Sequence, residues 1–209
     1  MDTIPISLPV PNLIDVQGAL RSATAGRHRA IEALLVFDTL ADRARYARIL
    51  QGFERFLAAW EPAVAAALPP SWRPWVAARS RHAMLLADLH ALDVPVYGAG
   101  DLDVLQGVAL RSVAAALGSL YVIEGSALGG QVIAKLLREK LAIVPEEGGA
   151  YFHGFGERTG AMWREFRERL QQGAGTTLAQ AQEASLCAAQ TFDALTVVFR
   201  ATLHEPRPA

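Results

Sequence analysis

The chain has 209 residues, of which 52% are hydrophobic and 20% are charged, so it can bury a substantial core and lacks the composition of a disordered protein. Its net charge of −1 gives no general attraction to nucleic acid or to an anionic membrane, and we expect neither as a partner. The one cysteine, Cys187, excludes an intramolecular disulfide and a multi-cysteine metal site, and its alanine-rich surroundings predict a buried filler.

Residues 1–13 contain three prolines and lack the pattern of a secretory signal, so we expect an irregular, mobile arm there. Residues 14–204 show helical periodicity nearly throughout and predict a single all-α domain. No apolar run reaches the length of a membrane span, and we expect a monomeric, cytoplasmic protein. In chain order, the predicted helices cover 15–35, 41–67, 73–91, 101–141 (one long helix or two abutting ones), 159–172 and 176–203, with irregular connections at 93–100 and 144–156.

One predicted helix has an unusual composition, because its apolar stretch 119–137 contains Gly125, Gly129 and Gly130. A glycine inside a helix costs about 0.5–1 kcal/mol relative to alanine. Gly125 and Gly129 are four residues apart and share one face, which lets the backbone lie against a flat partner, and Gly130 extends this bare surface around the helix. The same spacing serves close packing against another helix, so the pattern alone leaves both interpretations open.

Among the five histidines, His28 has the surroundings of a metal ligand. It lies in the middle of the first predicted helix, with Thr24 and Glu32 one turn to either side. A neutral imidazole on a rigid helix can bind a metal through one nitrogen while its other nitrogen donates to a neighbouring acceptor. Glu32 and the carbonyl of Thr24 are the local candidates for that acceptor.

Two segments together resemble a known family. The stretch LRSATAGRHRAIEALL (20–35) is similar to the proximal helix of haem oxygenases, and YVIEGSALGGQVIAKLL (121–137) is similar to their distal helix. The order of the two segments and the all-α setting also match. The resemblance is strongest to the bacterial branch that makes biliverdin, which includes members that serve bacterial phytochromes. It implies a haem-oxygenase-like bundle that holds haem between a proximal helix and a kinked distal helix.

The resemblance assigns roles to individual residues. It implies that haem b is both cofactor and substrate, and that His28 is the protein ligand of the iron. Gly125 and Gly129 match the distal glycines that contact the haem and flank the site of O2, and Gly130 belongs to the same surface. Distal glycines without Cβ atoms are expected to limit the directions in which O2 can lie.

Three further positions follow from the resemblance. Arg21 matches a basic position near a haem propionate, a carboxylate that arginine pairs with well. Tyr121 matches an aromatic residue at the haem edge. Ser126 stands where animal haem oxygenases have an aspartate that organises water beside the bound O2. A hydroxyl can hold water but carries no charge, so Ser126 is a weaker organiser, and the resemblance implies that other donors take part.

The implied reaction is the cleavage of haem by O2 and external electrons to biliverdin, CO and ferrous iron. The chain contains no flavin or nucleotide motif, so we expect a separate electron donor such as a ferredoxin or a flavoprotein reductase. Arg21 at its usual position favours the α isomer of biliverdin, which a bacterial phytochrome could receive. Two alternatives stay open: a non-catalytic haem-binding or haem-sequestering protein of the same fold, which Ser126 favours, and an all-α protein that binds no haem.

Overall fold

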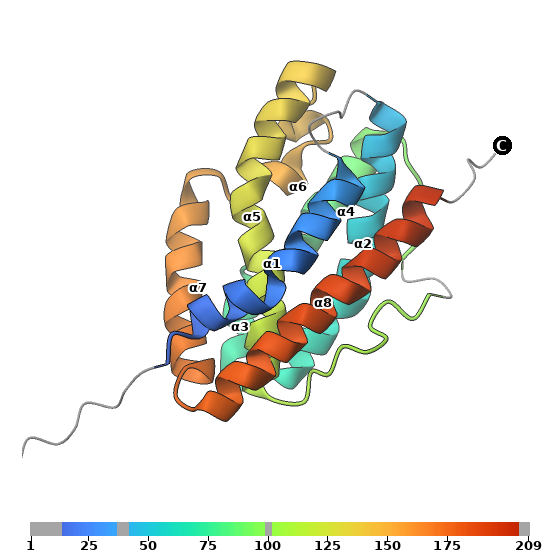
Figure 1. Cartoon of the computed structure of the whole chain (residues 1–209). Coiled ribbons are helices and arrows are strands. Elements are labelled where there is room, and N and C mark those ends of the chain that lie inside the picture. The colour runs from blue at the N-terminus through green and yellow to red at the C-terminus, as the bar shows by residue number, and fades with distance from the viewer. Residues whose placement is uncertain (1–13, 37–41, 99–101, 205–209) are drawn as a thin grey trace, which may run out of the picture.

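The structure, a computed structural model, describes residues 14–36, 42–98 and 102–204, and the arm predicted for residues 1–13 lies outside these ranges (Figure 1). The described residues form helices and connecting segments without any strand, which confirms the predicted all-α fold. The helices are α1 (Val16–Leu35), α2 (Arg43–Ala67), α3 (Arg73–Ala77), α4 (His82–Ala91), α5 (Val113–Leu141), α6 (Ala150–His153), α7 (Thr159–Ala174) and α8 (Leu178–His204), with short 3-10 turns at Pro70–Trp72, Pro145–Glu147 and Gly156–Arg158.

Side-chain caps determine where the long helices begin. The Asp15 carboxylate accepts a hydrogen bond from the Gly18 amide at the start of α1, at 2.8 Å. The Ser112 hydroxyl does the same for the Ala115 amide of α5, at 3.1 Å. Each cap satisfies an amide that the first helical turn leaves without a partner. These caps therefore fix the starts of the two helices that carry the residues of interest.

Two predicted helices are shorter than expected. The segment 73–91 is not one helix, because α3 ends at Ala77 and α4 begins at His82. In the segment 101–141 the helix begins only at Val113, after the Ser112 cap, and Gly107 before it adopts a left-handed φ of +81° that an α-helix does not contain. The connection 144–156, predicted to be irregular, contains the short helix α6.

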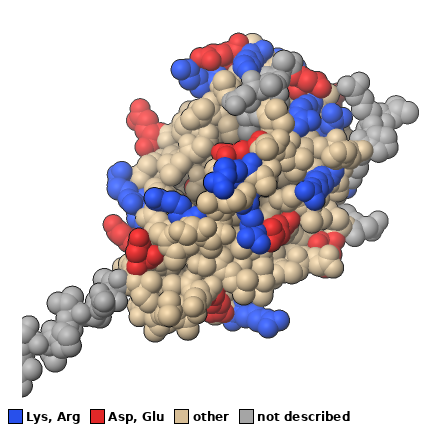
Figure 2. Space-filling model, viewed as in Figure 1, with Lys and Arg blue, Asp and Glu red and all other residues tan. Residues whose placement is uncertain are grey.

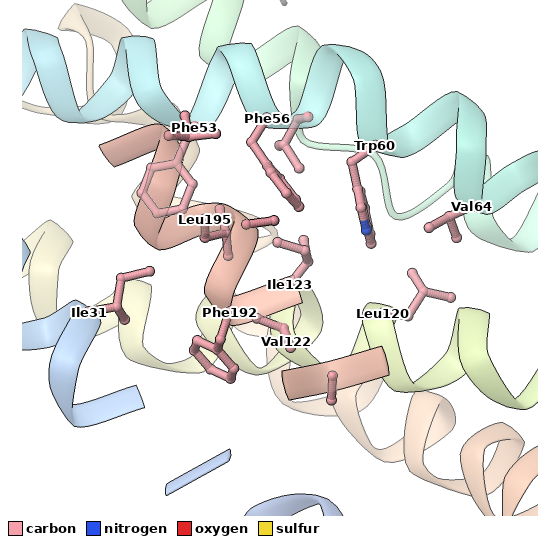
Figure 3. Packing of buried hydrophobic residues seen from close by; sticks show 14 of the residues in the cluster. Ile31, Phe53, Phe56, Trp60, Val64, Leu120, Val122, Ile123, Phe192 and Leu195 are labelled. Carbon is pink, nitrogen blue, oxygen red and sulfur yellow. The ribbon is translucent and has the colours of Figure 1, made fainter. Parts of the chain in front are cut away.

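The core lies where α2, α5 and α8 meet (Figure 3). The Trp60 indole on α2 donates a hydrogen bond to the Ser119 hydroxyl on α5, which is 2.7 Å from the Thr191 hydroxyl on α8. A Cβ atom on Gly118 would lie 2.0 Å from the carbonyl oxygen of Ala184, so the backbones of α5 and α8 are in direct contact. This buried polar chain and close packing make the first half of α5 a rigid support for the second half.

Helix α5 is long and apolar enough to cross a membrane by length and composition alone. However, 61% of its apolar window is buried inside the bundle, where it packs against α7 and α8. The central helix of a soluble bundle has this same composition. We therefore interpret α5 as a core helix.

Candidate functional site

Arg21 on α1 and Tyr121 on α5 lie close enough for the charge of Arg21 to act on the Tyr121 phenol. Burial raises the pKa of this phenol, and the positive charge of Arg21 opposes the shift. His28 follows Arg21 by about 10 Å along α1, and Gly129 follows Tyr121 by about 12 Å along α5. His28 and Gly129 therefore lie at comparable distances from the Arg21 and Tyr121 positions, each along its own helix.

His28 is exposed, with 56% of its side chain accessible. Its Nδ1 atom lies 3.3 Å from a carboxylate oxygen of Glu32, and its ring meets the Phe192 ring of α8 edge-on at 5.8 Å between centroids. Of the two acceptors considered from the sequence, Glu32 is therefore the one in contact. Because this contact engages Nδ1, the Nε2 atom remains available for a ligand.

The three glycines of α5 have different neighbours. A Cβ atom on Gly129 would meet no atom within 4 Å, and one on Gly125 would meet only Trp163, at 4.0 Å. A Cβ atom on Gly130, in contrast, would lie 2.8 Å from the carbonyl oxygen of Phe152 in α6. Gly130 is thus a packing residue between α5 and α6, and the expectation that it extends the bare surface is wrong. Packing between helices does not account for Gly129.

Two apolar side chains beside the glycines were missed from the sequence. Leu128 is 40% exposed and Val132 is 64% exposed. Val132 follows Gly125 by seven residues, two helical turns, and therefore projects from the same face of α5. The seven-residue spacing of Val132 from Gly125 could have indicated that it shares the glycine face. Leu128 and Val132 lie within an apolar run, however, and such residues are expected in the core. The open face of α5 is thus apolar and partly bare backbone, which suits a flat apolar ligand.

Polar groups lie beside the open face and toward the interior. The Ser126 hydroxyl donates to the Ile123 carbonyl at 2.7 Å and accepts a hydrogen bond from Arg81 at 2.8 Å. Glu124 is an ion-pair partner of the buried Arg79, at 2.6 Å, which identifies it as a structural carboxylate. Burial raises the pKa of Glu124, and the two arginines oppose that shift. Arg79 and Arg81 gave no signal in the sequence, because they lie in the break between α3 and α4.

The surface in this view carries Lys and Arg side chains interspersed with Asp and Glu, over a largely uncharged face (Figure 2). Among the described residues, no group of three or more His, Cys, Asp and Glu side chains gathers into a site for a metal ion. The exposed imidazole of His28 therefore belongs to no such group. Such an arrangement fits a metal that brings its other ligands with it, as in a metalloporphyrin.

The structure is an all-α bundle with an exposed histidine, His28, on α1 and bare glycine backbone on α5. The sequence model of the heme oxygenase family matches residues 15–201. The chain belongs to the haem oxygenase family, whose members are enzymes that bind haem and cleave it to biliverdin.

Two relatives show how similar the chain is to known proteins. A heme oxygenase of Xanthomonas campestris pv. campestris (strain 8004) is 33% identical over 137 residues, which cover 66% of this chain and 74% of that protein. The NO- and CO-bound heme oxygenase from Neisseria meningitidis has a similar fold, with a TM-score of 0.73 and 22% identity, over 93% of this chain and 94% of that chain. The predicted family and the predicted enzyme class are confirmed by these comparisons.

Proposed function

We propose that haem b, as substrate and cofactor, lies between α1 and α5, with the Nε2 atom of His28 as the protein ligand of its iron and Gly125 and Gly129 against its other face. The observation that carries this proposal is the open space at Gly129. A 29-residue helix retains a glycine there at a cost in stability, although no protein atom requires it. A ligand that lies against the backbone supplies the missing reason.

The surrounding residues have distinct tasks in this arrangement. The Glu32 carboxylate lies 3.3 Å from Nδ1 of His28, where its charge favours one ring orientation and strengthens the imidazole as a ligand. Leu128 and Val132 cover apolar surface of the macrocycle and exclude water from it. Arg21 offers its charge to a propionate, and Tyr121 lies beside the edge of the haem. Seating the propionates at this end favours the α isomer of biliverdin.

Bound haem supplies the O2 chemistry, and the chain supplies position and polarity. The bare backbone at Gly125 and Gly129 limits the space beside the iron, and Ser126 holds water at the border of that space. The electrons come from a separate donor, for which we propose a ferredoxin or a flavoprotein reductase of the cytoplasm. We propose that the protein acts as a monomer and that a bacterial phytochrome is one recipient of the biliverdin.

Anaerobic binding of hemin, followed by O2 and a reductant system, tests this function directly. We expect one haem per chain and its conversion to α-biliverdin with release of CO, with the product identified by chromatography. Ser126→Ala should bind hemin as well as the wild type and turn over more slowly. Hemin that binds and stays unchanged under these conditions would contradict the catalytic roles of Gly125, Ser126 and Gly129.

A further inference from the structure

Arg81 is a buried cation without a carboxylate partner. The residue is 3% exposed, and its guanidinium lies 4.6 Å from the centre of the Tyr151 ring. In the described part of the chain no carboxylate forms an ion pair with this guanidinium, and the contact with Glu61 at 3.3 Å uses the backbone amide of Arg81. Burying an unpaired charge is costly, so its position calls for a reason.

A neighbouring arginine shows the ordinary arrangement. Arg79 is also buried, and it forms ion pairs with Glu124 at 2.6 Å and with Glu165 at 2.8 Å. Burial raises the pKa of Glu124 and the charge of Arg81 opposes that rise, but the ion pair of this carboxylate is with Arg79. The charge of Arg81 is therefore not neutralised by direct contact.

One nitrogen of the Arg81 guanidinium makes both of its hydrogen bonds to α5. Its Nη2 atom donates to the Ser126 hydroxyl and to the Ile123 carbonyl, both at 2.8 Å. The Ser126 hydroxyl also donates to that carbonyl, at 2.7 Å. As part of a helix, the carbonyl further accepts from the amide four residues on, so three donors share an oxygen with two lone pairs. The Ser126 proton can therefore leave this carbonyl at little cost, because the carbonyl keeps its other donors.

The position of Ser126 on α5 places it at the edge of the open face that carries Gly125 and Gly129. It follows Gly125 directly, and consecutive residues of a helix are rotated by about 100°, so Ser126 stands between the open face and the interior. The residue is half-buried, in agreement with a border position. Arg81 contacts one side of this hydroxyl, the buried Tyr151 hydroxyl near it has no hydrogen-bond partner among the described residues, and the proposal requires the Ser126 proton to turn toward the face that carries Gly125 and Gly129.

We propose that Arg81 is a positioning residue that acts through Ser126. It holds the hydroxyl oxygen in place and leaves the proton free to be donated to water or to a ligand beside the glycines. Its unneutralised charge strengthens that donation, because donation to a hydroxyl oxygen makes its own proton a better donor. The inference rests on the haem placement proposed above, and it assigns the distal polarity of this chain to an arginine from the break between α3 and α4.

The C–O stretching frequency of CO bound to the reduced haem complex tests this inference, because a donor or a positive charge near the oxygen lowers it. We expect Arg81→Met and Ser126→Ala each to raise the frequency, and the double variant to raise it no further. Arg81→Lys, which keeps the charge, should retain part of the lowering. Fluoride should bind the ferric complex about tenfold more weakly in Arg81→Met and in Ser126→Ala, the loss expected for one hydrogen bond to a charged ligand.

Arg79→Met is the matched control, since it removes an equally buried arginine only two residues away. It should lower the stability of the protein and leave the frequency unchanged. Ser126→Ala removes only a hydroxyl, so it keeps the test valid even if Arg81→Met fails to fold. An unchanged frequency in Ser126→Ala and Arg81→Lys, or an equal shift in Arg79→Met, would overturn the inference. The Soret band of each variant reports haem placement separately, because only loss of His28 should abolish it.

Discussion

Alanine substitutions at the glycines of α1 and α5 separate glycines kept for packing from a glycine kept for a ligand. Gly129 and Gly26 both lie inside helices, and a Cβ atom on either would meet nothing within 4 Å. Replacing either by alanine should therefore stabilise the ligand-free protein by about 0.5–1 kcal/mol, because helix propensity improves and no clash arises. Gly118→Ala should instead cost about 3 kcal/mol or more, since its methyl group would overlap the Ala184 carbonyl.

The two stabilising substitutions should differ in haem binding. On Gly129 a methyl group would stand between the backbone and the macrocycle, and overpacking of that size costs about 1–3 kcal/mol, so affinity should fall about tenfold or more. Gly26 is two residues from His28 and lies near the opposite side of α1, so Gly26→Ala should bind haem normally. Urea unfolding of the ligand-free proteins and spectrophotometric hemin titration measure the two effects. A Gly129→Ala protein that is stabilised and binds hemin with unchanged affinity would refute close contact between haem and this backbone.

Three further predictions concern buried polar groups. Burial raises the pKa of Asp88 from 3.8 to about 6, so the folded state binds this proton more tightly than the unfolded state. Protonated Asp88 therefore contributes up to about 3 kcal/mol to the free energy of unfolding. This contribution is full below pH 3.8 and is lost as the pH rises through about 6. Asp88→Asn should flatten that part of the pH dependence in urea unfolding, and an unchanged slope would contradict it. Glu124→Gln should destabilise the protein by about 3 kcal/mol because it leaves Arg79 with one carboxylate, and a thermal melt at the wild-type temperature would argue against a structural ion pair. Ser119→Ala leaves the buried Trp60 N–H without its acceptor and should cost about 1–3 kcal/mol in the same unfolding assay, which an unaffected variant would rule out.

The long helices could be predicted from the sequence because their apolar residues repeat at helical spacing. The expected boundaries of the first and last helices agree with α1 and α8 to within two residues. The break between α3 and α4 could not be predicted in this way, because the charged residues within it, Arg79 and Arg81, have their partners on distant helices. Arg79 forms its ion pairs with residues of α5 and α7, and such long-range partners leave no local pattern.

The candidate site shows the same division. His28 and Gly125 stood out because each conflicts with a simple helical core, the first by its polarity and the second by its missing side chain. The error at Gly130 arose because its neighbour, the Phe152 carbonyl, comes from a different part of the chain. Val132 was missed for the opposite reason, since only the fold reveals that this apolar side chain is exposed.

The most direct test of the central claim is a hemin titration of the wild type beside His28→Ala. His90→Ala is the control, because it removes another exposed histidine, on α4. We predict that the wild type and His90→Ala form the same haem complex with a well-defined Soret band, and that His28→Ala loses or markedly shifts that band. Identical spectra for the wild type and His28→Ala would contradict the assignment of His28 as the ligand of the haem iron.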